Sequence, residues 1–215
     1  MLTMIIDHIG AILIEPLSLT SFLGFNHWET VYLVCRLIGR LAFPIFAFLI
    51  VEGYSHTHNF NKYLLRLISL ALLSEIPFDL AFNQSWFDMS YQNIFFTLSL
   101  GLIAIWSSDR WDNQFLGTLF PLGIIFMAEW LQVDYGAYGV FFIYILYVLR
   151  DKRLYQCIAG AVLGFLQLTA SLSFILIYFY NGQKGRANFR WMYVIYPVHL
   201  VILIFIRHGL FAYIY

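Results

Sequence analysis

Charged residues are scarce in this sequence. They make up 11% of the chain, whereas a typical soluble domain has about 25%. The 12 basic and 12 acidic residues cancel, so the chain lacks the basic surplus of a nucleic-acid-binding protein. Hydrophobic residues account for 61% of the chain, which leaves too few polar residues to coat a soluble core. We therefore expect a lipid bilayer around most of the surface and no nucleic-acid partner.

Cysteine is rare as well. Cys35 and Cys157 each lie in an apolar run, so we expect neither a disulfide framework nor a metal-binding cysteine pair. Two histidines lie two residues apart in the polar stretch 53–62, but a metal site would need further ligands, so we predict no metal. A cleavable signal peptide is not expected, because a basic start is missing and Asp7 and His8 interrupt the apolar run. The chain begins abruptly within its first helix, so we expect a few residues to precede it.

Long apolar runs fill most of the chain. Because a spanning helix needs about 20 mostly apolar residues, we predict an all-α fold, a polytopic transmembrane helical bundle of about nine spans (8–10) in one domain, 1–215. Residues 154–181 form either a tight hairpin that turns near Gln167–Thr169 or one long tilted helix, and the hairpin is favoured. The predicted spans are 1–19, 30–52, 63–83, 92–108, 114–132, 136–150, 154–167, 170–181 and 191–213.

Basic residues indicate the orientation of these spans. Lys and Arg concentrate in cytoplasmic loops near helix ends. Nine spans with the N-terminus inside place most of the basic residues on the cytoplasmic side, whereas one long helix at 154–181 would move the last three of them outside. We therefore predict an N-in, C-out topology. The basic residues at the predicted cytoplasmic face are Lys62, Arg66, Arg110, Arg150, Lys152, Arg153, Lys184, Arg186 and Arg190.

Two arginines and two carboxylates fall inside predicted spans, where ionisable groups are usually paired or functional. A rise of about 1.5 Å per residue puts Arg40 level with Glu75, and Arg36 level with Asp79. Within each span the two residues lie four apart and so share one helix face. We predict two bracing ion pairs, Arg40–Glu75 and Arg36–Asp79. In a sharper interpretation, one arginine stays free to hold a phosphate or carboxylate near the membrane centre.

His8 is the strongest candidate for chemistry, because histidine titrates near neutral pH and suits proton transfer. His8 and His199 share a predicted depth of roughly 10–12 Å from the cytoplasmic face. Asp7 points about 100° away from His8 around the helix, so one of them faces a cavity and the other orients a neighbouring group. A satisfied polar residue within the bundle is the alternative for each histidine.

The segment Gly182–Arg186 is a compact basic turn at the predicted cytoplasmic face. Lys184 and Arg186, together with exposed backbone amides, are suited to bind a phosphorylated ligand. The same two charges could instead serve only to keep this turn on the cytoplasmic side of the membrane, and both interpretations stay open.

Short motifs follow one another in a fixed order from the first span to the last. They are Met4–Gly10, Gly39–Phe46, Glu52–Tyr54, Lys62–Tyr63, Arg66–Leu67, Ser74–Phe78, Tyr180–Gly185 and Tyr196–Leu200. In order and spacing these motifs resemble those of the TraX family of bacterial membrane proteins. The middle of the chain, roughly 100–150, matches only in general character, with Asp134–Tyr135 as its clearest point.

The resemblance implies a membrane acetyltransferase of the bacterial cytoplasmic (inner) membrane. TraX is associated with N-terminal acetylation of pilin subunits, and its family is considered related to membrane acyltransferases that modify surface sugars with acyl-CoA. An intramembrane histidine is the proposed catalytic group of those relatives, and His8 takes that place here. The resemblance thus implies acetyl-CoA as acyl donor and an acceptor protein or glycan.

We accordingly predict His8 as the general base that activates an amine or hydroxyl. Asp7, or a carboxylate on another span, is predicted to fix the imidazole tautomer. Arg40 is predicted to polarise the thioester carbonyl or the developing oxyanion, provided that Glu75 does not neutralise it. A small proton-coupled transporter or flippase, or a non-catalytic component of a surface-assembly system, remain the alternatives. The predicted donor phosphate contacts are Lys184, Arg186, Lys62 and Arg66. The residues predicted to contact the substrate or support the site are Arg36, Glu52, Glu75, Asp79, Tyr196 and His199.

Overall fold

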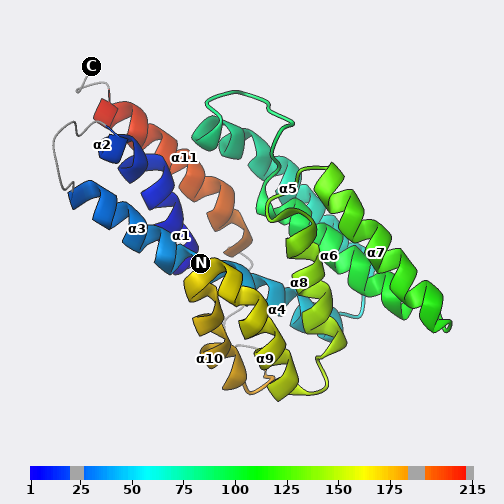
Figure 1. The fold of residues 1–215 in the computed structure, drawn as a ribbon. Helices are drawn as coiled ribbons and strands as arrows, with labels where there is room; N and C mark the ends of the chain where they lie inside the picture. The colour runs from blue at the N-terminus through cyan, green and yellow to red at the C-terminus, as the bar shows by residue number, and fades with distance from the viewer. Residues whose placement is uncertain (20–26, 184–191, 212–215) are drawn as a thin grey trace.

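The computed structural model describes residues 1–19, 27–183 and 192–211, and these are almost entirely helical (Figure 1). Over these ranges the structure has no β-strand, and an isolated bridge between Gln92 and Val133 is its nearest approach to one. The main apolar core lies where α4, α5, α6, α8 and α11 meet, and Leu67, Phe142 and Leu200 are fully buried in it. The predicted all-α class is confirmed.

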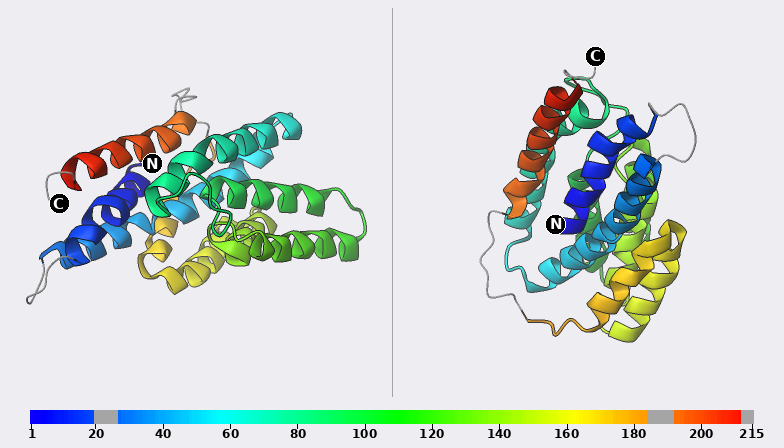
Figure 2. Two further views of the ribbon diagram at one scale, coloured as in Figure 1. Left: turned by 90° about the horizontal axis from the view of Figure 1, so that it is seen from above. Right: turned by 90° about the vertical axis from the view of Figure 1, so that its left-hand side faces the viewer.

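The observed helices follow the predicted spans closely. The first span is a continuous helical rod of α1, a π-helical turn and α2, and α11 packs against this rod and against α5 (Figure 2). The bounds are α1 Leu2–Ile9, the π-helical turn Gly10–Ile14, α2 Glu15–Leu19, α5 Phe60–Phe82, α6 Ile94–Asp109, α7 Gln114–Trp130, α8 Gly136–Val148 and α11 Met192–Phe211.

The second predicted span is broken near its middle. Helix α3 (His27–Gly39) ends before Arg40, and α4 (Ala42–His56) begins two residues later. Pro44 has no amide hydrogen, so it cannot donate to the carbonyl of Arg40 four residues earlier, and the helical ladder stops there. The amide of Arg40 still donates to the carbonyl oxygen of Arg36 at 3.1 Å, so the backbone stays helical up to Arg40, and both arginine charges act on Asp7.

The segment 154–181 is a hairpin, as favoured from the charge distribution. Helix α9 (Arg153–Gly164) runs through a 3₁₀ segment (Phe165–Leu172) into α10 (Ser173–Tyr178), and α9 and α10 lie side by side (Figure 1). The backbone leaves the helical region at Gln167 and Leu168.

By length and composition alone, two helical stretches could cross a membrane, His27–His56 and Arg153–Tyr178, and each contains one of the breaks described above. Four further apolar helices are shorter: Ile94–Asp109, Gln114–Trp130, Gly136–Val148 and Val194–Leu210. Large side chains such as Phe126 and Phe205 are exposed to the surroundings, as expected of a surface in contact with lipid. These features indicate a membrane protein. The count of about nine spans is not confirmed and stays a prediction.

Segments predicted for the same side of the membrane lie together. Tyr54 at the end of α4 donates a hydrogen bond to Asp109 at the end of α6, at 3.0 Å. At the opposite end of the bundle, Tyr91 in the α5–α6 loop donates to Asp134 in the α7–α8 loop, at 2.5 Å. We name the first the inner end and the second the outer end, after the predicted orientation.

Candidate functional site

His8 of α1 and His199 of α11 form a hydrogen-bonded pair inside the bundle. His8 Nδ1 lies 2.7 Å from His199 Nε2, and the two ring planes are inclined by only 12°. The sequence had placed the two histidines at one depth, and the structure brings them into contact.

The hydrogen bonds of this pair determine its neutral tautomers. His199 Nδ1 lies 2.9 Å from the carbonyl oxygen of Ile195. A carbonyl only accepts, so His199 Nδ1 carries the hydrogen and His199 Nε2 accepts. His8 Nδ1 therefore donates to His199, which leaves the lone pair on His8 Nε2. Within the described ranges no hydrogen bond engages His8 Nε2. The prediction that Asp7 fixes this tautomer is wrong, since His199 does so.

Aromatic rings enclose the histidine pair. Tyr196, which is 2% exposed, packs edge-on against His8 and His199 with ring centroids 5.8 and 5.5 Å away. Phe82 of α5 packs edge-on against His8 at 5.4 Å. These contacts restrict rotation of the imidazoles and limit the access of water to them.

An apolar cavity of about 530 Å³ leads from the inner end toward the histidine pair, and we name it the inner cavity. Glu52, Arg66 and Tyr180 line it at the inner end, and Met4 and Tyr196 line it deeper in the bundle. Met4 is one helical turn before His8 on the same face of α1. The cavity therefore ends next to the pair.

The predicted phosphate contacts fall into two groups. Arg66 lines the inner cavity, whereas Lys62 is exposed near the start of α5, where its backbone amide is capped by Asn59. Lys184 and Arg186 lie outside the described residues. Glu52 pairs with Arg153 at 3.3 Å and so joins α4 to α9 at the inner end.

Asp7 points away from His8, toward α3. Its Oδ2 accepts from Arg36 Nη1 at 2.8 Å, and both side chains are half-buried. Gly39 permits this approach, because a Cβ atom there would collide with the Asp7 side chain. The second oxygen of Asp7 is buried and has no hydrogen-bond partner among the described residues. The predicted Arg36–Asp79 pair is wrong.

Arg40 directly follows α3 and lies near the same carboxylate as Arg36. Its charge acts on Asp7, Asp134 and Tyr135. Burial raises the pKa of Asp134 to about 6, although the hydrogen bond from Tyr91 and the charge of Arg40 oppose this shift. The predicted Arg40–Glu75 pair is wrong.

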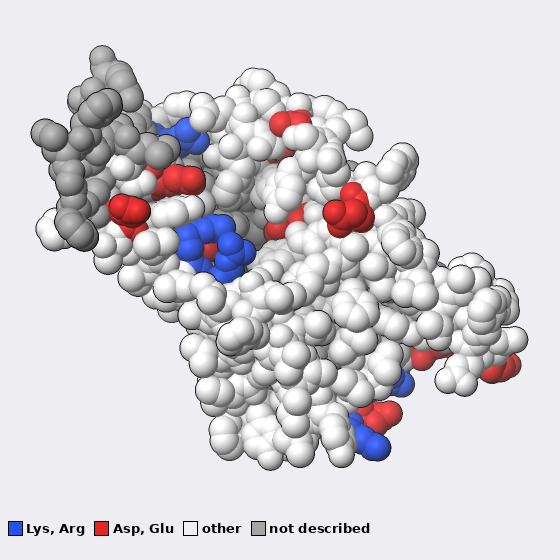
Figure 3. All heavy atoms as spheres, viewed as in Figure 1, with Lys and Arg blue, Asp and Glu red and all other residues white. Residues whose placement is uncertain are grey.

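We name Asp7, Arg36, Arg40, Tyr91 and Asp134 the outer polar cluster. Figure 3 shows acidic and basic side chains around a hollow in a face of the protein that otherwise carries few charged residues. Asp134 was not predicted as a site residue, although it is the only charged residue in the loop between α7 and α8 and has no basic residue beside it. A carboxylate without a basic residue nearby in the sequence needs a partner from another segment, and this requirement could have linked Asp134 to Arg40.

The carboxylates of α5 hold the outer loop instead of bracing α3. Glu75 accepts from the side-chain amide of Asn93, which caps the start of α6. Asp79, fully buried, accepts from the backbone amide of Asp88 at 2.8 Å and from Asn83. Both carboxylates find these partners in the segment that directly follows their own helix.

The fold and site define an all-helical protein that holds a histidine pair and a charged cluster within an apolar bundle. The family model described as TraX protein matches residues 1–207, so the chain belongs to the TraX family, as its motifs indicated. The chain is similar to the "Probable fimbrial assembly protein FimC, serogroup H1" of Dichelobacter nodosus. The two are 29% identical over 217 residues, which cover 86% of this chain and 87% of that relative. No solved structure matches the chain.

Proposed function

We propose that this protein is a membrane-embedded acetyltransferase. It would move an acetyl group from cytosolic acetyl-CoA to an amine or hydroxyl of a surface-destined acceptor. One observation carries the proposal: the histidine pair adjoins the inner cavity through Tyr196 and adjoins the outer polar cluster through Asp7, the residue before His8. A donor and an acceptor that approach from opposite sides would meet at this pair. The name of the similar fimbrial assembly protein supports an acceptor such as a pilin N-terminus or a surface glycan.

The inner cavity suits the pantetheine arm of the donor. Its volume of about 530 Å³ falls in the usual range of ligand pockets, and its walls are largely apolar. Arg66 at its inner end is available to a phosphate of the donor. The thioester would then lie near Tyr196, next to His8.

His8 Nε2 is the proposed general base. It takes the proton of the acceptor amine or hydroxyl as that atom attacks the thioester carbonyl. A carbon–nitrogen or carbon–oxygen bond forms, the carbon–sulfur bond breaks, and the CoA thiolate leaves and takes up the proton. His199 continues to accept from His8 Nδ1, which stabilises the imidazolium. Arg40, whose charge acts on the neighbouring Asp7, supplies positive charge for the developing oxyanion.

Purified protein in lipid nanodiscs with radiolabelled acetyl-CoA tests the proposal. We expect binding of CoA, and transfer of label to cell-envelope material from the producing cells. His8→Ala should lower the rate about 10²- to 10⁴-fold. His208→Ala, a change of an exposed histidine in α11, is the matched control. Absence of CoA binding, thioester hydrolysis and transfer would refute the enzyme.

A non-catalytic role in surface assembly is the second candidate, because the relative is named only for fimbrial assembly. In that case the charged cluster would serve only to hold the bundle together. Wild-type surface assembly by the His8→Ala protein, without incorporation of acetyl label, would favour this role.

A further inference from the structure

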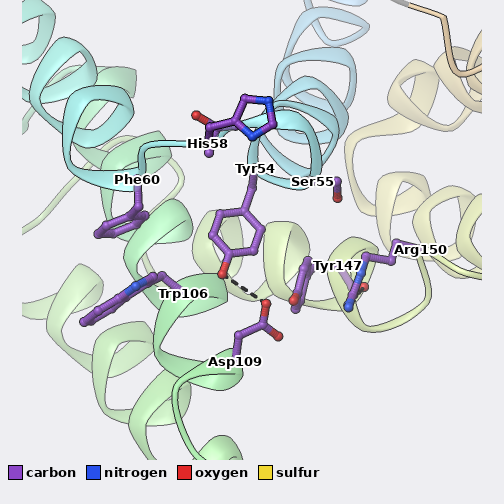
Figure 4. Close-up of a pocket in the computed structure, with 9 residues that line it drawn as sticks. Tyr54, Ser55, His58, Phe60, Trp106, Asp109, Tyr147 and Arg150 are labelled. Carbon is purple, nitrogen blue, oxygen red and sulfur yellow. Dashed lines mark hydrogen bonds between the residues drawn. The ribbon is translucent and has the colours of Figure 1, made fainter.

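A second cavity lies at the inner end, next to the inner cavity (Figure 4). It has a volume of about 450 Å³ and is formed by the ends of α4, α6 and α8 with the start of α5. Thr57 lines both cavities, so the two adjoin. All the segments that form it are predicted to face the cytosol. The mechanism proposed above does not use this second cavity.

Flat aromatic rings form much of its wall. Phe60 and Trp106 stack with ring centroids 4.9 Å apart and planes inclined by 14°. Tyr54 meets Tyr147 edge-on at 5.6 Å. In Figure 4 these four side chains gather around one space. Such walls suit a flat heteroaromatic ring, which gains stacking energy from the aromatic faces.

The polar groups of this cavity are not saturated. Tyr54 donates to Asp109 Oδ2, the dashed line in Figure 4. Tyr147 is 3% exposed, and its hydroxyl, although Asp109 lies near, makes no hydrogen bond of good geometry within the described residues. Buried polar groups are almost always hydrogen-bonded. Asp109 lies near both tyrosine hydroxyls, and its carboxylate can accept a further hydrogen bond from a polar ligand at this wall.

Arg150 adds a positive charge at the rim. Its guanidinium lies 3.8 Å above the ring of Tyr147 and donates to the carbonyl oxygen of the same residue at 3.0 Å. The part of the chain that the structure describes offers it no carboxylate within ion-pair distance. A planar guanidinium with free N–H groups suits a phosphate.

We propose that the second cavity binds the adenine nucleotide of the acyl donor. Adenine stacks on the Phe60–Trp106 wall, its amino group or a ribose hydroxyl donates to Asp109, and a phosphate contacts Arg150. The pantetheine arm then continues past Thr57 into the inner cavity. This inference rests on the proposed acetyltransferase function and assigns the part of the site that distinguishes CoA from a bare pantetheine thioester.

Equilibrium binding to the full chain in nanodiscs tests it with CoA, 4′-phosphopantetheine, adenosine 3′,5′-bisphosphate and ATP as probes. Trp106→Leu should weaken the binding of CoA and the bisphosphate about 10- to 100-fold and leave 4′-phosphopantetheine unchanged. Trp111→Leu, whose ring stacks on Phe120 outside the cavity, is the matched control. Asp109→Asn, nearly isosteric, gives a second variant with the same expected pattern if Trp106→Leu fails to fold.

Each other outcome overturns a distinct claim. If CoA and 4′-phosphopantetheine bind equally, or if Trp106→Leu behaves as Trp111→Leu does, the nucleotide site is refuted while acetyl transfer stands. If ATP binds as tightly as the bisphosphate in a Trp106-dependent way and CoA does not compete, the cavity takes a free nucleotide and the assignment to the donor is refuted. Binding of all three adenine compounds without any acetyl transfer supports the site and refutes the acetyltransferase.

Discussion

The histidine pair yields the sharpest prediction, because one of its members is proposed to act only through the other. Replacement of His199 by Leu removes the acceptor for His8 Nδ1 and leaves that half-buried N–H unpaired. His199→Gln should keep the pair, since a glutamine oxygen can occupy the place of Nε2 and its amide can donate to the carbonyl of Ile195.

The expected magnitude follows from that hydrogen bond. An unsatisfied buried donor costs about 1–3 kcal/mol, which corresponds to roughly a 5- to 150-fold lower kcat. Loss of the base itself in His8→Ala should lower kcat about 10²- to 10⁴-fold. His199 does not line the inner cavity, so KM for acetyl-CoA should stay constant in both His199 variants.

Single-turnover and steady-state release of labelled acetyl groups from acetyl-CoA by protein in nanodiscs provides the assay. The predicted order of kcat is wild type, then His199→Gln, then His199→Leu, then His8→Ala. Equal rates for His199→Leu and His199→Gln would show that the hydrogen bond between the histidines has no catalytic role. A change confined to KM would place His199 in donor binding, against the geometry.

Three further predictions concern stability and titration. Arg36→Met should destabilise the half-buried pair by about 1–3 kcal/mol, between the values for exposed and buried pairs, and joint replacement with Asp7→Leu should recover most of the loss in a thermal-unfolding cycle. Gly39→Ala, which collides with Asp7, should cost about 1–3 kcal/mol in the same assay, whereas Gly123→Ala, with open space around it, should not destabilise. The carboxyl of Asp134 should titrate near pH 6, above its unfolded value of about 4, so its contribution to stability is full at low pH and is lost as the pH rises through 6. An infrared band of protonated carboxylic acid that disappears near that pH, and is missing in Asp134→Asn, would confirm the titration; its persistence in the variant would contradict it.

The apolar runs predicted the helices well, because their period and length depend on the local sequence. The charge bias also favoured the hairpin at 154–181, and the structure contains it. The sequence predicted a similar depth for His8 and His199, and their contact was found only in the structure. The predicted depths use only the position of a residue along the helix axis. That position follows directly from the rise per residue.

The pairing of the buried charges was not predictable from depth alone. Depth does not specify how a helix is rotated about its axis, so Arg36 was assigned to Asp79 although it contacts Asp7. The break at Arg40 was detectable in principle, since Pro44 removes the hydrogen bond to its carbonyl. The hydrogen bonds of Asp79 depend on the path of an irregular loop, which no periodic pattern encodes.

The different chemistry on the two sides of the histidine pair argues for group transfer over transport. An ion or proton path needs polar groups along its whole length, yet the inner cavity is largely apolar up to Met4 and Tyr196. The Asp7–Arg36 pair and Arg40 are not part of the cavity lining, and they form a separate charged group next to His8. An apolar arm on one side and a polar acceptor on the other match this division. Group transfer needs a base with a fixed tautomer next to both substrates, and His8 is the proposed base. A passive transport path has no need of such a base.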